Sequence, residues 1–313
     1  MPDRFSPPPM AHAAETGAGS GPEAVSPLMI IPAGAVRQFI ADHDPLIIAV
    51  DGLPPKPDVG GYLQGAILQK EVAWAIDSRT DGELRDLSAW STLLGRIGVD
   101  GRRPVLLYDN GDLKFASRLR FLINYYGTDR AFLIDGGWRA LQPLVAKGEL
   151  KAQAAPSPFT PVQNHLRIIN SPIRLAFAED VRQSLKAGDA QIIDVRMCIE
   201  YIGTCVFSGI HRPGHIPGAI NLPVNHLQTP QDLLLSPAEL RAVFADYGIR
   251  NDRPLIFYCQ DGARSSLAAL AAVRAGYRAV NLYYQSFLGW QNEPQNEVIT
   301  GGRVCPPGEI CPH

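Results

Sequence analysis

The sequence has little net charge and no long apolar run. Its 313 residues carry 29 Lys and Arg against 31 Asp and Glu, a formal charge of -2 at pH 7, and no basic cluster stands out. We therefore expect neither nucleic acid nor an anionic membrane surface as a partner. No apolar run approaches the roughly 18 to 20 residues that span a bilayer, and the first residues lack a charged-then-apolar signal pattern, so we expect a cytoplasmic protein.

Cysteine is scarce as well. The five cysteines are odd in number and scattered, so we expect at least one free thiol and no disulfide framework. Their spacing to His211 and His215 fits no zinc pattern, and we expect neither a metal nor a cofactor. Cys305 and Cys311 could form a disulfide loop, act as a resolving pair for a persulfide or have no role. The cysteines are Cys198, Cys205, Cys259, Cys305 and Cys311.

Composition divides the chain into two parts of similar size. With 46% hydrophobic residues, the chain is long enough for two domain cores. The start is rich in Pro, Ala and Gly, and a stretch after Lys147 carries three prolines and few large apolar residues. We therefore expect a disordered tail at 1–27, a first domain at 28–148, a linker at 149–170, a second domain at 171–298 and a C-terminal tail at 299–313.

The two parts resemble each other. Four matches keep the same order along the chain, with an offset that drifts by a few residues as loop insertions would cause. They are 46–51 with 191–196, 61–67 with 214–220, 103–109 with 253–259, and Trp138 with Trp290. This internal similarity predicts two copies of one fold.

Strand and helix patterns alternate within each copy. The short, mostly apolar or β-branched runs 191–195, 255–258 and 279–283 are typical of buried parallel strands. Ser236 to Glu239 forms a capping box with proline at the first helical position, and the Ala-rich stretch 264–275 is followed by Gly276. The alternation predicts an α/β fold with two mostly parallel sheets, each covered by helices on both faces.

Cys259 stands where such a fold places ligands. It directly follows a predicted strand and precedes a predicted helix, so it lies at the carboxyl end of a sheet strand. Gly262 lets the loop curl, and N–H groups at the helix start then point to its centre, while Arg264 adds a positive charge. A thiol there is expected to ionise easily and act as a nucleophile; a buried structural cysteine is the alternative.

The motifs around Cys259 resemble those of a known family. The segments 194–196, 200–201, 214–219 and 259–265 stand in the order and spacing of the rhodanese family, and Gly137-Trp138 extends the resemblance to the first copy. Both halves resemble rhodanese domains, and the whole chain resembles a tandem-domain sulfurtransferase. This implies that Cys259 accepts a sulfane sulfur as a persulfide and passes it to a thiophilic acceptor such as cyanide, a thiol or a thioredoxin-like protein.

The resemblance also implies roles for the surrounding residues. Asp194 and Arg196 are expected to form an ion pair that orders the loop. The first copy is expected to be catalytically silent, because Asp109 takes the place of Cys259 and a carboxylate cannot form a persulfide. The expected substrate-binding residues are Gln260, Asp261, Gly262, Ala263, Arg264 and Ser265.

Alternative functions fit this loop less well. Cysteine phosphatases and arsenate reductases place one residue more between Cys and Arg than the four that separate Cys259 from Arg264. A non-enzymatic rhodanese-like binding module would be expected to lack the cysteine. The small anionic donor is expected to be thiosulfate, because Arg264 and the serines after it resemble thiosulfate enzymes; 3-mercaptopyruvate is the alternative. Asp261 is expected to oppose an anionic donor by like charge.

Overall fold

Two five-stranded parallel sheets form the frame of the protein. The computed structural model describes residues 30–51, 61–70, 80–164 and 171–302, so the predicted N-terminal tail, Cys305 and Cys311 lie outside the described residues. The strand order is β1-β6-β5-β2-β4 in the first sheet and β8-β12-β11-β9-β10 in the second. Every strand pair within these sheets is parallel, which confirms the predicted α/β class.

Short apolar segments form these strands. The first sheet contains β1 (Ile30–Ile31), β2 (Leu46–Asp51), β4 (Ile67–Lys70), β5 (Val105–Tyr108) and β6 (Ala131–Ile134). The second contains β8 (Ile173–Ala176), β9 (Gln191–Asp194), β10 (Ile220–Asn221), β11 (Leu255–Tyr258) and β12 (Val280–Tyr283). A separate antiparallel pair joins β3 (Tyr62–Leu63) to β7 (Ala152–Gln153), so the stretch expected to be a linker contributes a strand.

Helices follow most strands. The first half contains the short 3-10 helix η1 (Ala33–Ala35), α1 (Val36–His43), α3 (Asp81–Arg85), α4 (Leu87–Arg96), α5 (Lys114–Tyr126) and α6 (Gly137–Ala146). The second contains α7 (Ala178–Ala187), α8 (Cys198–Tyr201), the 3-10 helix η2 (Val224–Leu227), α9 (Pro237–Asp246), α10 (Ala263–Arg274) and α11 (Ser286–Asn292). The predicted capping box begins α9, with the Ser236 hydroxyl accepting the Glu239 N–H. Within the described ranges, no helix is both long and apolar enough to cross a membrane.

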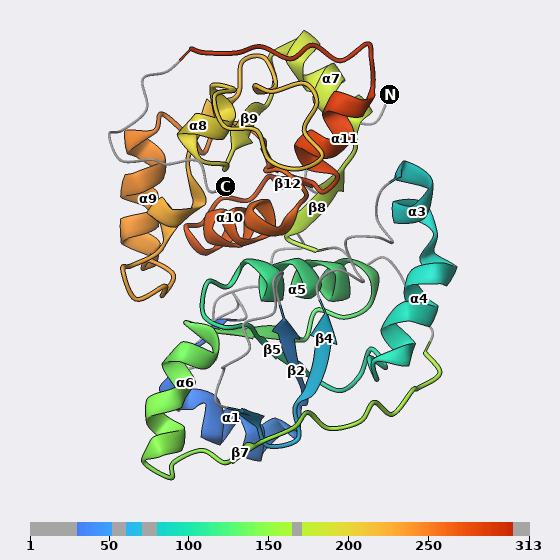
Figure 1. Ribbon diagram of the computed structural model, residues 1–313, viewed down its shortest axis with the longest axis vertical. Coiled ribbons are helices and arrows are strands. Elements are labelled where there is room, and N and C mark those ends of the chain that lie inside the picture. The colour runs from blue at the N-terminus through green and yellow to red at the C-terminus, as the bar shows by residue number, and fades with distance from the viewer. Residues whose placement is uncertain (1–29, 52–60, 71–79, 165–170, 303–313) are drawn as a thin grey trace, which may run out of the picture.

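The two halves pack against each other through α5 and α10. Figure 1 shows these helices facing one another between the two sheets, and they are in contact. One apolar cluster continues from Leu119 and Leu122 of α5 to Ala268 and Ala271 of α10, all of them buried. The alanines let the two helix backbones approach closely. Burial of each large apolar side chain contributes roughly 1.5 to 3 kcal/mol, so this seam is part of the core.

Backbone register shows which positions of the two halves correspond. Ala49 of β2 pairs with Tyr108 of β5, and Asp194 of β9 pairs with Tyr258 of β11. The two tyrosine hydroxyls make equivalent contacts, accepting the N–H of Leu63 at 3.0 Å and of Ile216 at 3.1 Å. The matches 46–51 with 191–196 and 103–109 with 253–259 therefore occupy corresponding places in the two sheets.

The predicted match of Trp138 with Trp290 is wrong. Trp138 is the second residue of α6, and the second residue of α11 is Phe287. Their N–H groups donate to the carbonyls of Asp109 at 2.7 Å and Cys259 at 3.0 Å, so Phe287 is the counterpart of Trp138. Residue identity misled the comparison, because both tryptophans are buried core residues but stand at different turns of their helices.

Candidate active site

Cys259 lies between a central strand and a helix of the second sheet. It follows β11 directly, and α10 begins four residues later at Ala263. Its neighbours β9 and β12 flank β11, so the loop lies at the carboxyl edge in the middle of the sheet. Cys259 is a free cysteine with no exposed surface. The position agrees with the one that the strand and helix patterns indicate.

Hydrogen-bond donors surround the sulfur of Cys259. The Gly262 N–H donates to Sγ at 3.1 Å, and the Ser265 hydroxyl lies 3.5 Å from it. The Ser286 hydroxyl lies 4.0 Å from Sγ. These donors, with the start of α10 behind them, stabilise negative charge on sulfur. The arrangement suits a thiolate nucleophile.

Gly262 is required by the shape of this loop. Its φ of 102° lies in a region that favours glycine, and a Cβ at this position would lie 2.6 Å from the Tyr284 carbonyl oxygen. The close approach turns the Gly262 N–H toward the sulfur. A side chain here would move the loop away from Tyr284 and take the N–H with it.

Arg264 binds a carboxylate of the second half. Its guanidinium contacts both Glu200 carboxylate oxygens, at 2.6 and 2.9 Å, and Glu200 is 2% exposed. Burial lowers the pKa of Arg264, but the hydrogen bonds and charge of Glu200 outweigh it and raise the pKa above its usual value. The arginine expected to hold an anionic donor is therefore already paired with an acid from α8.

Asp261 forms an ion pair with the first half of the chain. Arg118 of α5, whose side chain is 1% exposed, donates to an Asp261 carboxylate oxygen at 2.9 Å and to the Asp261 carbonyl. The Asp261 side chain is 42% exposed, and its Oδ1 lies 3.9 Å from Sγ of Cys259. Burial raises the pKa of Asp261, but Arg118 and then Arg264 lower it below its usual value. The repulsive charge expected from Asp261 is thus largely compensated.

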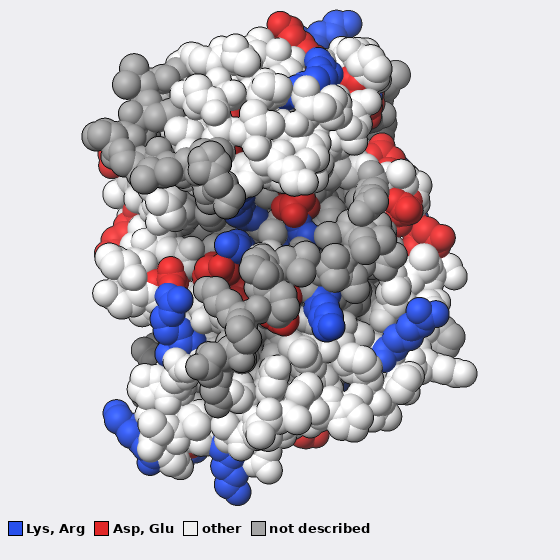
Figure 2. Space-filling view, viewed as in Figure 1, with Lys and Arg blue, Asp and Glu red and all other residues white. Residues whose placement is uncertain are grey.

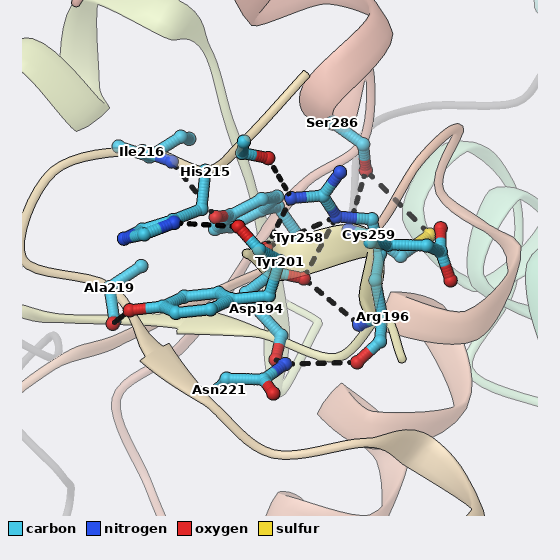
Figure 3. A network of polar contacts seen from close by, with 12 residues as sticks. Asp194, Arg196, Tyr201, His215, Ile216, Ala219, Asn221, Tyr258, Cys259 and Ser286 are labelled. Atoms are coloured by element: carbon cyan, nitrogen blue, oxygen red, sulfur yellow. Dashed lines mark hydrogen bonds and ion pairs between the residues drawn. The ribbon is translucent and has the colours of Figure 1, made fainter. Parts of the chain in front are cut away.

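A buried polar network lies at the end of the strand next to β11. Arg196 pairs with Asp194 at 2.6 Å and donates to the Gly214 carbonyl at 2.7 Å, and both side chains are almost fully buried. Asn221 donates to the carbonyls of Asp194 at 3.1 Å and Arg196 at 2.9 Å. Figure 3 shows this network beside Cys259. The ion pair predicted from sequence is present, on the strand next to β11.

The remaining loop residues face the backbone around them. The Gln260 side chain donates to the Ser208 carbonyl at 3.4 Å, and the backbone carbonyl of Gln260 accepts the Leu288 N–H at 2.9 Å. Ala263 is buried at the first position of α10. The loop therefore contacts Ser208 on one side and α11 on the other.

The first half contains a comparable cradle of backbone N–H groups, and the Asp109 side chain fills it. The Asp109 carboxylate accepts the N–H groups of Gly111 and Leu113 at 3.0 Å each and of Ala116 at 3.1 Å. Burial raises the pKa of Asp109 to about 6; Asp112 adds to the rise, and the three N–H bonds oppose it. A carboxylate thus occupies the place where the second half holds a thiol.

Two other cysteines differ from expectation. Cys198 and Cys205 are disulfide-bonded, although the scattered spacing suggested no disulfide framework. Both are almost fully buried. Disulfide formation depends on the distance between Cα atoms in the fold, and spacing along the chain does not reveal that distance. The expected free thiol is present at Cys259.

His215 has a structural environment. Its ring stacks on Tyr201 with centroids 3.5 Å apart, and Nδ1 lies 2.8 Å from the Tyr201 carbonyl oxygen. Burial lowers the pKa of His215. Among the residues that the structure describes, no three His, Cys, Asp or Glu side chains gather in a way that could hold a metal ion.

Sequence reasoning missed two residues at this site. Arg118 reaches the loop from 143 positions away, and no local signal marks it. The sequence offers one signal for Ser286, which is its position shortly after a predicted strand of the sheet. Figure 2 shows acidic and basic side chains close together across the middle of this face of the molecule.

Several known proteins are similar to this chain in sequence. Residues 177–293 match the family model described as a rhodanese-like domain. Human 3-mercaptopyruvate sulfurtransferase is 31% identical over 215 residues, 67% of this chain and 70% of the relative. A thiosulfate sulfurtransferase of Pseudomonas aeruginosa is 28% identical over 274 residues, 87% of this chain and 97% of the relative. The sulfur carrier protein TtuD of Thermus thermophilus is 27% identical over 279 residues, 85% and 94% of the two chains.

A solved structure supports the fold. The anaerobic ergothioneine biosynthesis enzyme from Chlorobium limicola superimposes with a TM-score of 0.73 at 22% identity, covering 88% of this chain and 71% of that one. At this identity the likeness concerns the fold. The sequence relatives carry the assignment further, because the human enzyme exceeds 30% identity over most of its length. The chain belongs to the rhodanese family and is a sulfurtransferase.

Proposed function

We propose that Cys259 is the nucleophile and carries the sulfur as a persulfide. The observation that supports this most directly is the Gly262 N–H at 3.1 Å from Sγ, at the start of α10. An N–H in this position stabilises negative charge on either sulfur of the reaction, first the thiolate and then the persulfide. Ser265, at 3.5 Å, adds a hydroxyl donor.

The donor that we propose is thiosulfate. The Cys259 thiolate attacks the outer sulfur, a new S–S bond forms, and the bond to the sulfonate sulfur breaks with its electron pair leaving on sulfite. An acceptor nucleophile then attacks the terminal persulfide sulfur and returns the electron pair to Sγ. The Pseudomonas relative, named for thiosulfate, aligns over nearly its whole length, which supports this choice.

3-Mercaptopyruvate is the second candidate donor, because the human relative is named for it. Cyanide, a small thiol or a thioredoxin-like protein are the proposed acceptors. The charged groups around Cys259 are paired, so donor selection rests on N–H and hydroxyl contacts more than on net charge. The pairs are Arg264 with Glu200, Arg118 with Asp261 and Arg196 with Asp194.

The first half is proposed to be catalytically silent and to support the site. Asp109 fills the cradle that Cys259 occupies in the second half, and a carboxylate offers no sulfur. The contribution of this half to the site is Arg118, which contacts Asp261. The proposed domains are 28–148 and 171–298.

Intact-mass measurement tests the proposal. Protein incubated with thiosulfate should gain one sulfur atom that maps to the peptide containing Cys259, and the gain should be absent in Cys259→Ser. Turnover with cyanide should be faster with thiosulfate than with 3-mercaptopyruvate. Sulfur that maps to Cys305 or Cys311, or that persists in Cys259→Ser, would overturn the assignment of the nucleophile.

A further inference from the structure

Ser286 adopts a backbone conformation that serine rarely takes. Its φ is 57°, and it is one of only four non-glycine residues with positive φ among the described positions. It is fully buried at the start of α11. A non-glycine residue held in this left-handed region costs about 1 kcal/mol or more, and such strain is concentrated at functional sites.

The first half makes the same turn with glycine. Gly137 has a φ of 52° and begins α6 after β6, as Ser286 begins α11 after β12. The N–H of the next residue donates to the carbonyl of Asp109 in the first half and of Cys259 in the second. Glycine therefore satisfies this turn without strain, and the serine of the second half requires a separate explanation.

The Ser286 hydroxyl provides that explanation. The hydroxyl oxygen accepts the Cys259 N–H at 3.1 Å, and the O–H donates to the Tyr283 carbonyl at 3.0 Å. The same oxygen lies 4.0 Å from Sγ, and Figure 3 shows it directed at Cys259. Rotation about the C–O bond can turn the hydroxyl proton from Tyr283 toward Sγ without moving the backbone.

We propose that Ser286 is a positioning residue for the sulfur-carrying cysteine. It fixes the Cys259 backbone through the N–H, and its hydroxyl turns toward Sγ when that sulfur becomes anionic. This rests on the proposed role of Cys259. In sulfur release, the S–S bond breaks and its electron pair returns to Sγ, where Ser286 donates a hydrogen bond and keeps its proton. The strained turn is retained because only a side chain with a hydroxyl supplies both contacts.

Two substitutions separate the hydroxyl from the turn. Ser286→Gly removes the hydroxyl and the strain together and reproduces the residue of the first half; Ser286→Ala removes the hydroxyl alone. Ser184→Ala is the matched control, because the hydroxyl of this buried serine in α7 has no hydrogen-bond partner among the described residues. The charged groups facing Cys259 are unchanged in all three variants: Arg264, Glu200, Arg118, Asp261, Arg196 and Asp194.

The measurement is the rate of Cys259 alkylation by iodoacetamide against pH, with thermal unfolding and turnover of each variant. We expect the midpoint to rise by about one pH unit in both Ser286 variants and kcat to fall about tenfold, as loss of a hydrogen bond to a charged group predicts. Ser286→Gly should unfold at a higher temperature than Ser286→Ala, because glycine relieves the strain that alanine retains. The control should match the wild type.

The outcomes distinguish this inference from the proposed function. Unchanged alkylation midpoints in both Ser286 variants would refute a role for the hydroxyl. A fall in activity that follows thermal stability alone would also refute it, because a merely structural serine gives that result. If the midpoint rises but the wild type transfers no sulfur, the contact with Sγ stands and the proposed function fails.

Discussion

Neutralising Asp261 tests how charge acts on the sulfur of Cys259. The carboxylate Oδ1 lies 3.9 Å from Sγ, and at an effective dielectric constant near 20 one unit charge at this distance is worth about 4 kcal/mol. The Asp261 side chain is 42% exposed, and Arg118 contacts the same oxygen at 2.9 Å. Solvent and the arginine therefore reduce the net effect on a thiolate to about 1 kcal/mol.

In Asp261→Asn, the Arg118 guanidinium faces the sulfur without its counter-ion. We expect the pH midpoint of Cys259 alkylation to fall by about one unit and kcat/KM for thiosulfate to rise several-fold. The gain should be smaller for singly charged 3-mercaptopyruvate. The cost is a nearly buried arginine without a carboxylate, which should lower the free energy of unfolding by about 1 to 3 kcal/mol after allowance for the exposure of Asp261.

A control with the same change of charge keeps this test specific. Asp252→Asn removes a fully exposed carboxylate that pairs with Arg250 at the surface, and it should change neither the alkylation midpoint nor turnover. If Asp261→Asn stays folded but slows thiosulfate turnover, or leaves the midpoint where it was, the carboxylate acts by orienting the loop. The electrostatic argument would then be wrong.

Two further changes probe the other charged groups. Glu200→Gln removes the partner of Arg264 and should lower KM for thiosulfate several-fold with less effect on 3-mercaptopyruvate; equal effects in steady-state kinetics would contradict a charge mechanism. Asp109→Asn should leave turnover nearly unchanged but alter the pH dependence of stability. Burial raises the pKa of Asp109 from 3.8 to about 6. The contribution of protonated Asp109 to the free energy of unfolding is therefore fully present below pH 3.8 and is lost as pH rises through 6. The loss is roughly 3 kcal/mol, and urea unfolding at pH 4 and 8 should show it in the wild type and not in the variant; the same dependence in both would contradict this origin.

Local patterns made part of this site predictable. An apolar strand, a cysteine, a glycine and a helix start stand within about ten residues, so sequence alone indicates the edge of the sheet and the cradle around Cys259. The Asp194–Arg196 pair is equally local, because two positions separate its members. The α/β class follows from the same alternation of short strands and helices.

Contacts between distant segments were not predictable in this way. Arg118 and Asp261 meet because α5 and α10 pack together, and nothing near either residue records that packing. The strain at Ser286 is likewise invisible in the sequence, since serine is ordinary at helix starts and only φ reveals the left-handed turn. The sequence indicates the negative charge of Asp261 but not its partner, because Arg118 belongs to the other half.

The α5–α10 seam limits how this protein can be dissected. The rhodanese-like match covers only residues 177–293, which invites expression of the second half alone. Such a fragment would expose the alanine face of α10 to water and would leave Asp261 without Arg118. Exposed apolar surface of this kind promotes aggregation. The first half thus covers an apolar face of the second, and a shortened protein would need other side chains to cover α10 before it could be used alone.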